Sequence, residues 1–343
     1  MIQLETPRNT CGWGLGLTDT FRNNSGKLFG RFGTNLQNPT KNICSIYYAD
    51  RDKCLVQIDQ SGAEALIVSM LCRADGNYRK LFANKIKPHS YVAIHLFKYS
   101  WLKEGHDITP AVCKADINGL RKLPGFNELY DTVKNNYKRY FLGKKTVHAA
   151  TYAMGTGVFI SSALKESEGK IVLTPKEGDM FLELFHSILP EIQEDFQQEV
   201  SFMLKRDGLL RNLFGHPRRI YGPLIDYNIK AFYAFIPQST VGCITNIAMV
   251  DFYNYIRKEG RDWDILNNKH DSFLYQCPAN EVDESISVAQ NMMNMNLVTY
   301  KGETFKMQSE VQVGLNWGEY DKEHNNDGLK KYEPNTRVIT SNQ

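Results

Sequence analysis

The chain has 343 residues, of which 42% are hydrophobic and 23% charged, and its formal net charge is +3. This composition is that of a folded globular chain with one large or two smaller domains, and the small net charge means that any nucleic-acid binding must rest on local basic patches. No apolar run reaches the roughly 18 residues that span a bilayer, no secretory signal opens the chain, and the seven cysteines include no C-x-x-C pair, so we expect reduced thiols in a cytoplasm and neither a membrane partner nor a zinc site.

In chain order, residues 21–39 are rich in glycine and asparagine and read as a surface loop. The strongest local pattern follows. Residues 54–58 predict a buried strand that ends on Asp59, and residues 63–72 predict an apolar helix, with Ser61 as its N-cap and Glu64 as the capping-box partner. An acidic residue at the end of a buried strand is often catalytic, although a turn or cap residue is the simpler alternative.

A second pattern lies on a predicted helix at residues 137–157. Lys144, His148 and Tyr152 stand at positions i, i+4 and i+8, so they share one helix face. Positive charge followed by an aromatic ring suits a triphosphate followed by a base. An amphipathic surface helix is the alternative. The amphipathic helices predicted over residues 174–206 are interpreted as scaffold.

Residues 263–277 predict a β-hairpin with His270 and Asp271 at its tip. If this hairpin is the neighbour of the strand that ends on Asp59, the two carboxylates can share a pair of divalent cations. Such cations prefer oxygen ligands and act as a two-metal clamp in phosphoryl transfer.

At these motifs the chain resembles a known family. Asp59-Gln-Ser-Gly-Ala-Glu64 is similar to motif A (D-x-S-x-x-E) of family-A DNA polymerases, the bacterial polymerase I type, and Lys269-His-Asp-Ser272 is similar to motif C, which has H-D-S variants among phage members. The resemblance keeps the family's order across most of the chain. It implies an α+β fold, with an antiparallel palm sheet at residues 1–75 and 223–320, helical fingers at residues 76–222 that hold the motif B helix (about 139–157), and a polar tail at residues 321–343.

The resemblance also implies an activity, the template-directed transfer of a nucleotidyl group from a dNTP to a primer 3′-OH. Two Mg²⁺ ions, with Mn²⁺ as an alternative, are expected on Asp59 and Asp271, with Gln60 as a further ligand. Glu64 is expected to reject a ribose 2′-OH. The remaining expected nucleotide contacts are Ser61, Gly62, Gln60, His89, Lys144, His148 as the acid for the leaving pyrophosphate, and Tyr152 as the base-stacking ring.

Primer-template DNA is the expected partner. Arg22 matches the family's minor-groove arginine, with Arg31 as a rival because the spacing varies. The other expected DNA contacts are Asn35, Gln37, Arg218, Lys230, Gln238 and His270.

Several positions depart from the family pattern. Lys144 and His148 replace an Arg and a Lys, Ala153 replaces a Gly, Thr156 replaces a Tyr, and Ser272 stands where a second acid is usual. Because 58 residues precede Asp59, the thumb and exonuclease domains are expected to be absent or supplied by a second polypeptide. The expected location is the cytoplasm of a bacterium or of a phage-infected host. The alternatives are a DNA-binding or assembly subunit derived from a polymerase, and a metal-dependent nuclease, which does not explain the face of Lys144.

Overall fold

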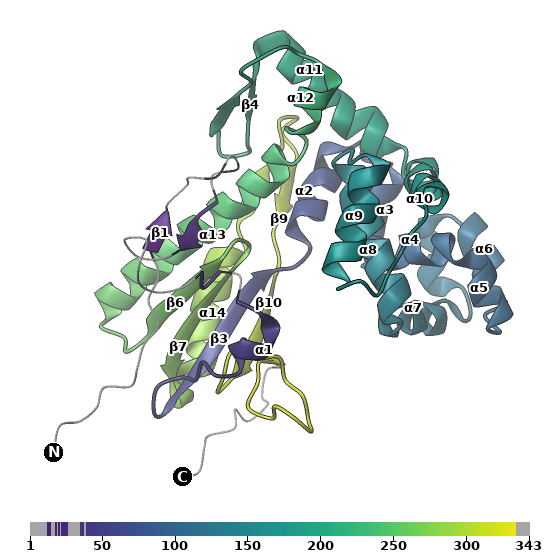
Figure 1. Cartoon of the computed structure of the whole chain (residues 1–343). Helices are drawn as coiled ribbons and strands as arrows, with labels where there is room; N and C mark the ends of the chain where they lie inside the picture. The colour runs from purple at the N-terminus through teal and green to yellow at the C-terminus, as the bar shows by residue number, and fades with distance from the viewer. Residues whose placement is uncertain are drawn as a thin grey trace. The chain divides into compact units, whose positions relative to one another are not determined.

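The computed structural model describes residues 12–14, 18, 20, 22–26, 35–37 and 39–333. The chain divides into two compact units. The first contains Met1–Glu64, Asn212–His216 and Ile236–Gln343, and the second contains Ala65–Arg211 and Pro217–Phe235. Figure 1 shows the elements of both units. None of the helices formed by the described residues has the length and apolar character required to cross a lipid bilayer.

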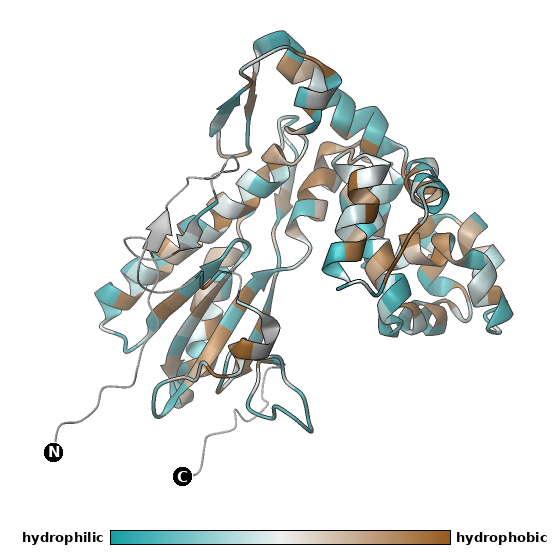
Figure 2. Ribbon diagram, viewed as in Figure 1, coloured by the Kyte–Doolittle hydropathy of each residue, from teal (hydrophilic) through white to brown (hydrophobic). Residues whose placement is uncertain are grey.

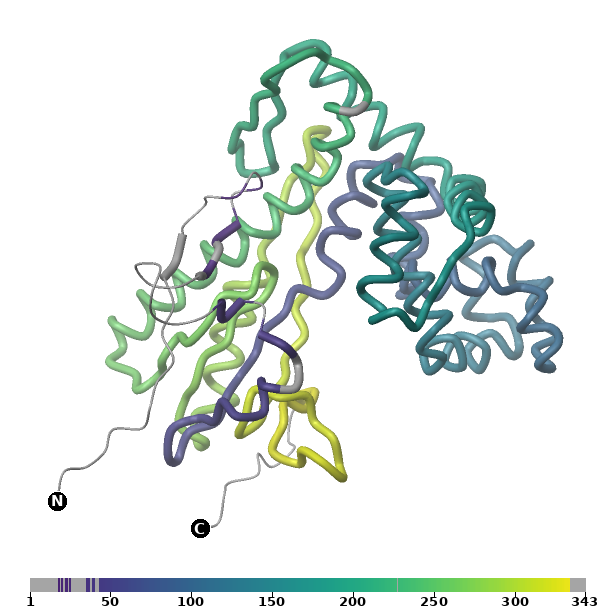
Figure 3. Tube along the Cα trace, viewed as in Figure 1, coloured from purple at the N-terminus to yellow at the C-terminus, as the bar shows by residue number. Residues whose placement is uncertain are grey.

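The first unit is built on a five-stranded sheet with the order β11-β10-β3-β7-β6, antiparallel throughout. Its strands are β3 (Lys53–Gln60), β6 (Asp264–Lys269), β7 (Ser272–Pro278), β10 (Ser309–Gly314) and β11 (Lys330–Lys331). Figure 3 traces how β3 and β10, from opposite ends of the sequence, lie side by side. The β3 strand is at the centre, which explains why its sequence is apolar on both faces.

Two helices, α13 (Phe235–Glu259) and α14 (Val282–Met293), cover one face of this sheet. Val56 and Ile58 of β3 pack there with Phe252 of α13 and Phe273 of β7, all buried. Leu55 points to the opposite face, into a smaller cluster with Trp317 and Leu329. The alternation follows from the two-residue period of a strand, and it decides which site residues share a face. The segment between β10 and β11, yellow in Figure 1, is largely hydrophilic in Figure 2.

Short elements complete the first unit. Two hairpin pairs are β1 (Gly12–Gly14) with β2 (Asn24–Gly26), and β8 (Asn296–Val298) with β9 (Thr304–Lys306). The others are α1 (Lys41–Cys44), the start of α2 (Ala63–Leu71) and a 3-10 turn at Ala279–Glu281.

The second unit is mostly helical. Its elements are α3 (Asn77–Ala83), α4 (Pro88–Leu96), α5 (Lys98–Lys103), α6 (Thr109–Lys114), a 3-10 turn (Ile117–Lys122), α7 (Phe126–Asn135), α8 (Tyr137–Thr151), α9 (Thr156–Glu166), α10 (Pro175–Ile188), a π-helical turn (Ile192–Gln197), α11 (Gln198–Asp207), the hairpin β4 (Leu209–Arg211) and β5 (Pro217–Arg219), and α12 (Asp226–Lys230). A capping box between Thr174 and Glu177 starts α10.

Helices α4 and α8 pack closely because Gly143 has no side chain. A Cβ atom at Gly143 would lie 2.4 Å from the carbonyl oxygen of His89 and 2.9 Å from the Cβ of Ala93. Any larger residue would push the two helices apart. The α+β fold predicted from the sequence, an antiparallel sheet with helices plus a helical portion, is confirmed.

Candidate active site

The β6–β7 hairpin and the end of β3 bring two carboxylate residues to the same end of the sheet, where β3 finishes and β7 begins. Strand β3 pairs with β7 so that Asp59 lies opposite Ser272. The backbone N–H of Gln60 donates to the carbonyl oxygen of Asp271 over 3.0 Å. The predicted hairpin is confirmed, and β7 is the neighbour of β3, which is the condition that the sequence left open. Asp59 and Asp271 therefore lie at adjacent strand ends.

The hairpin tip is tightly wound. His270 adopts a left-handed backbone conformation with φ of 58°, which is uncommon for a residue with a Cβ atom. The N–H of Asp271 donates to the carbonyl of Lys269 over 2.7 Å, and the hydroxyl of Ser272 donates to the same carbonyl over 3.3 Å. The strained turn holds His270 and Asp271 at this end of the sheet, and Ser272 stabilises that turn.

The tip is electrostatically unbalanced. Burial raises the pKa of Asp271, and the nearby negative charge of Glu64 raises it further, while Arg22 and His270 act in the opposite direction. Burial, helped by the charge of Arg22, lowers the pKa of His270. The Nδ1 atom of His270 is buried, and the described residues offer it no hydrogen-bond partner. This arrangement leaves a buried carboxylate that a cation would stabilise in its ionised form.

The residues present fit an oxygen-seeking divalent cation. Asp59 and Asp271 supply carboxylate oxygens, the donor type that Mg²⁺ prefers. Within the described residues, no group of three or more His, Cys, Asp or Glu side chains has the arrangement of a complete metal site. Any ion here would therefore complete its coordination with oxygens from the substrate, from water or from the backbone.

The side chain of Gln60 points to the other face of the sheet. Its Nε2 atom donates to the carbonyl of Val241 over 3.2 Å and to the hydroxyl of Thr245 over 2.7 Å, both on α13. The side chain thus fastens the strand end to α13. The predicted contribution of Gln60 to metal binding stays a prediction.

Glu64, in the first turn of α2, is held from two sides. Its Oε1 atom forms an ion pair with the guanidinium of Arg22. Its Oε2 atom accepts a hydrogen bond of 3.4 Å from Nε2 of Gln238, in the first turns of α13. Ser61 donates its hydroxyl to Glu310 and its backbone N–H to the carbonyl of Gln308, both over 2.9 Å. The N–H that the expected capping box would give to Glu64 is therefore used elsewhere. Gly62 supplies the left-handed turn between strand and helix, with φ of 59°.

An amide network fixes the segment that carries Arg22. Asn23 donates to the side chain of Asn246 on α13 over 2.7 Å. Gln37, which is buried, donates to the carbonyl of Asn23 over 3.0 Å and more weakly to Asn268. Asn35 accepts from Ser25 at the exposed end of this network. Sequence reasoning missed Asn23, Asn246 and Asn268, for which only the asparagine-rich composition gave a signal. Arg31 lies outside the described residues.

In the second unit, the expected phosphate-binding residues lie together. Lys144 and His148 are exposed on α8, and His89 lies on α4 where the two helices meet at Gly143. Burial, together with the positive charges of Lys144, Lys87 and His148, lowers the pKa of His89 to about 3. His89 is therefore neutral at physiological pH and adds no positive charge to the cluster.

Tyr152 follows the last residue of α8, and its ring meets the ring of His148 edge-on at 5.0 Å. The helix ends in a Schellman motif, in which Met154 N–H donates to the carbonyl of Ala149 and Ala153 N–H to that of Ala150. Ala153 takes the left-handed position of that motif, with φ of 51°. Glycine is favoured there, which gives a physical reason for the glycine in the family pattern.

Two further predicted DNA contacts lie in the second unit. Arg218 is half-buried, stacks over the ring of Phe232 at 4.3 Å and donates to the carbonyl of Ala231 over 3.2 Å. These contacts show a packing role. Lys230 is exposed and lines a cavity of about 340 Å³ beside the end of α8, together with Ala150, Ala153, Met154, Leu182, His186, Gln193, Gln197, Asp226 and Tyr233.

Comparison with known proteins identifies the fold. No protein-family model matches the sequence, and no curated protein matches it either. Among solved structures, the POL domain of Pol1 from M. smegmatis, in a complex with a DNA primer-template and a dNTP, is similar with a TM-score of 0.61 at 18% sequence identity. The match covers 90% of this chain and 47% of that one, so the chain spans about half the length of its structural neighbour. The chain has the palm-and-fingers type of fold found in a DNA polymerase.

Proposed function

We propose that this chain is a DNA-directed DNA polymerase that joins a dNTP to a primer 3′-OH by a two-metal mechanism. One observation carries the proposal: Asp59 and Asp271 end adjacent antiparallel strands, joined by the hydrogen bond between Gln60 and Asp271. The polymerase-like fold supports it. The raised pKa of Asp271 supports it further, because a carboxylate that resists ionisation is stabilised by a bound cation.

Each side chain has a distinct part in the proposed reaction. Asp59 and Asp271 would hold two Mg²⁺ ions, which when bound would activate the 3′-OH and neutralise charge on the phosphates. Lys144 would contribute positive charge to the triphosphate. His89, neutral at working pH, would donate a hydrogen bond to a phosphate oxygen. His148 would hold a proton on its ring and give it to the leaving pyrophosphate.

The remaining residues would orient the substrates. Tyr152 would stack on the incoming base, and Glu64 would exclude a ribose 2′-OH. Arg22 and His270, which lie beside the carboxylates, would contact the primer terminus. Lys230, Gln238 and Arg218 would contact DNA without reading its sequence.

A second candidate is a DNA-binding subunit without catalysis. It is favoured by Ser272, whose hydroxyl stabilises the hairpin turn where the family pattern has a second acid. In this case the chain would bind primer-template DNA and leave the primer unextended.

Single-turnover primer extension separates the two candidates. The purified chain is mixed with a labelled primer-template, Mg²⁺ and dNTPs, with Asp59→Asn as the matched control. The polymerase proposal expects templated extension by the wild-type chain and none by the variant. Normal DNA binding by the wild-type chain without extension would support the second candidate.

The expected second polypeptide with thumb and exonuclease parts stays a prediction. It is checked by single-hit primer extension, in which a trap prevents the enzyme from rebinding the template and product length reports the nucleotides added per encounter. The chain alone is expected to add only a few nucleotides per encounter and to bind DNA less tightly as salt rises. Co-purification with a second protein that lengthens the products would support it, and products of hundreds of nucleotides from the chain alone would contradict it.

A further inference from the structure

The carboxylate of Glu64 is bound by two side chains that come from distant parts of the first unit. Arg22 precedes β2 and binds Oε1, and Gln238 in α13 binds Oε2. The side chains of Arg22 and Glu64 are 16% and 27% exposed, so the ion pair is largely shielded from water. A charge-assisted hydrogen bond in such a place is stronger than one between exposed groups.

Arg22 and Gln238, which bind this carboxylate, are themselves held in place by the surrounding structure. The backbone N–H of Arg22 donates to the hydroxyl of Thr18 over 2.8 Å, and that hydroxyl also approaches the carbonyl oxygen of Arg22 at 3.1 Å. Asn23, the next residue, is tied to Asn246 of α13. Gln238 lies on that same helix. Arg22 and Gln238 therefore hold Glu64 from two segments that are joined through Asn23 and α13, and together they are called the bracket around Glu64.

A free glutamate in the first turn of a helix would sample several rotamers, and fixing it costs conformational entropy. A side chain that rejects one extra oxygen atom must keep its own position to within a fraction of an ångström. The bracket supplies that restraint, because each carboxylate oxygen has its own donor. A loose Glu64 would leave room for a larger sugar part of the time.

We infer that Arg22 and Gln238 are positioning residues that hold Glu64 in place and so set the preference for deoxyribonucleotides over ribonucleotides. The inference rests on the proposed polymerase function and on the role proposed there for Glu64. It differs from the DNA-contact role expected for Arg22 and Gln238, because a lost DNA contact weakens incorporation of both sugars equally. A lost positioning contact changes the ratio between them.

The test measures kcat/KM for a dNTP and for the matching rNTP on one primer-template. Arg22→Ala should lower the dNTP-to-rNTP ratio about tenfold to a hundredfold, which converts to about 1.4–2.7 kcal/mol and lies in the range of a hydrogen bond to a charged group. Gln238→Ala should lower it less, by about twofold to tenfold. Arg22→Lys, which keeps a cation, should retain part of the selectivity. Lys230→Ala, a proposed phosphate contact, is the matched control and should lower both rates while leaving the ratio unchanged.

A double substitution makes the test specific. With Glu64→Ala as the background, adding Arg22→Ala should leave the ratio unchanged, because no carboxylate remains to be positioned. An unchanged ratio in Arg22→Ala alone, or equal losses for both sugars, would overturn the inference while the proposed function stands. A wild-type chain that incorporates neither nucleotide would overturn the proposed function itself. Thermal unfolding verifies that each variant folds, and Arg22→Lys with Gln238→Ala decide the matter if Arg22→Ala does not.

Discussion

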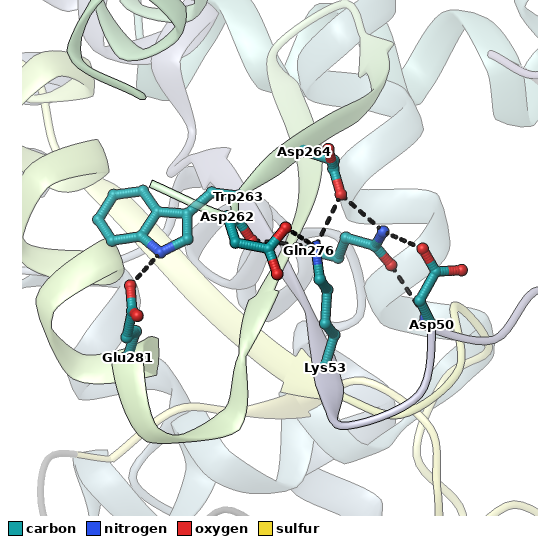
Figure 4. Close-up of polar contacts among 7 residues, drawn as sticks. All are labelled: Asp50, Lys53, Asp262, Trp263, Asp264, Gln276 and Glu281. Atoms are coloured by element: carbon teal, nitrogen blue, oxygen red, sulfur yellow. Dashed lines mark hydrogen bonds and ion pairs between the residues drawn. The ribbon is translucent and has the colours of Figure 1, made fainter. Parts of the chain in front are cut away.

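The charged groups at the two ends of the central strands β3 and β7 differ in whether their surroundings favour the ionised form. At the end where β3 begins, the ammonium of Lys53 lies 2.7 Å from Oδ1 of Asp262 and 3.0 Å from Oδ2 of Asp264, and Gln276 donates to Asp50 and Asp264 (Figure 4). Burial lowers the pKa of Lys53, but the hydrogen bonds that its ammonium donates to Asp262 and Asp264, together with the negative charges of both acids, outweigh burial and raise the pKa. At the other end, the pKa of the Asp271 carboxyl is also raised, but for an acid this means that the charged form is disfavoured.

The difference distinguishes a cluster whose charges compensate one another from a cluster in which the charge of Asp271 is disfavoured, as the proposed metal site would require. Around Lys53 the partly exposed acids surround a cation that belongs to the chain. Around Asp271 the acids Asp59 and Glu64 gather with Arg22, and burial still works against ionisation of Asp271. A fold keeps such an arrangement at a cost in stability when function needs it.

The largest expected effect is the loss of catalysis at one end only. Asp59→Asn or Asp271→Asn should reduce primer extension more than about a thousandfold, because each removes a carboxylate ligand of the proposed cations. Asp264→Asn at the Lys53 end should change the rate by less than about twofold, as an ordinary surface substitution does. Rapid-quench primer extension checks this. More than a few per cent of the wild-type rate in either active-site variant would rule out the two-metal assignment.

Activity should fall on acidification at a pH above the ordinary aspartate pKa. Asp271 must be ionised to hold a cation, and its raised pKa means that protonation begins at a higher pH than in a free carboxyl. Arg22→Met removes a charge that lowers this pKa, so the acid limb should move to still higher pH. Lys53→Met should leave the limb in place. A pH profile of single-turnover rates measures both, and a limb that does not respond to Arg22→Met would break the assignment.

The same imbalance should appear in the stability of the metal-free protein. A carboxyl whose pKa is raised on folding destabilises the folded state once the pH exceeds the unfolded pKa, and the full penalty is present above the folded pKa. Asp271→Asn should therefore raise the unfolding temperature at neutral pH without divalent cations. Mg²⁺ at ten times its Kd should stabilise the wild type by about 1.4 kcal/mol and the variant much less. Calorimetry with and without Mg²⁺ checks this, and equal stabilisation of the two proteins would place the ion elsewhere.

Lys53→Met should destabilise the folded protein, whereas Asp271→Asn should stabilise it. The side chain of Lys53 is 11% exposed while its partners Asp262 and Asp264 are 74% and 51% exposed, so the acids can rehydrate and the loss is limited to about 1 kcal/mol. Because the pKa of Lys53 is raised, its contribution is present at neutral pH and is lost only in strongly alkaline solution. Urea unfolding at neutral pH measures the change. A stabilising substitution would show that the cluster around Lys53 is not balanced.

The smallest expected effect belongs to Ala153, which changes neither end of the sheet. Ala153→Gly should stabilise the chain by about 0.5–1 kcal/mol, because glycine adopts the left-handed position at the end of α8 without a steric cost. Thermal unfolding measures the gain. Destabilisation would mean that the methyl group of Ala153 makes a packing contact worth more than the relieved strain.

Local patterns in the sequence determined the elements that carry the chemistry. The apolar run before Asp59, the hairpin around Asp271 and the helix that holds Lys144 and His148 were all predicted, because strand and helix periodicity depend on nearby residues. These patterns also placed His148 four residues after Lys144 on one exposed face. The polymerase-like fold was implied by the resemblance of these motifs to those of a known family.

Only the tertiary structure decided what surrounds those residues. Arg22 and Gln238, which are far from Glu64 in the sequence, contact its carboxylate, whereas the nearby Ser61 donates to Glu310 and Gln308. The burial of Gln37 and the close approach of α4 and α8 at Gly143 likewise depend on which segments meet. Periodicity tells which face of an element is apolar, but not which distant side chain will lie against it. That choice is made when the whole core packs, because the same carboxylate satisfies many donors and only one is brought within reach.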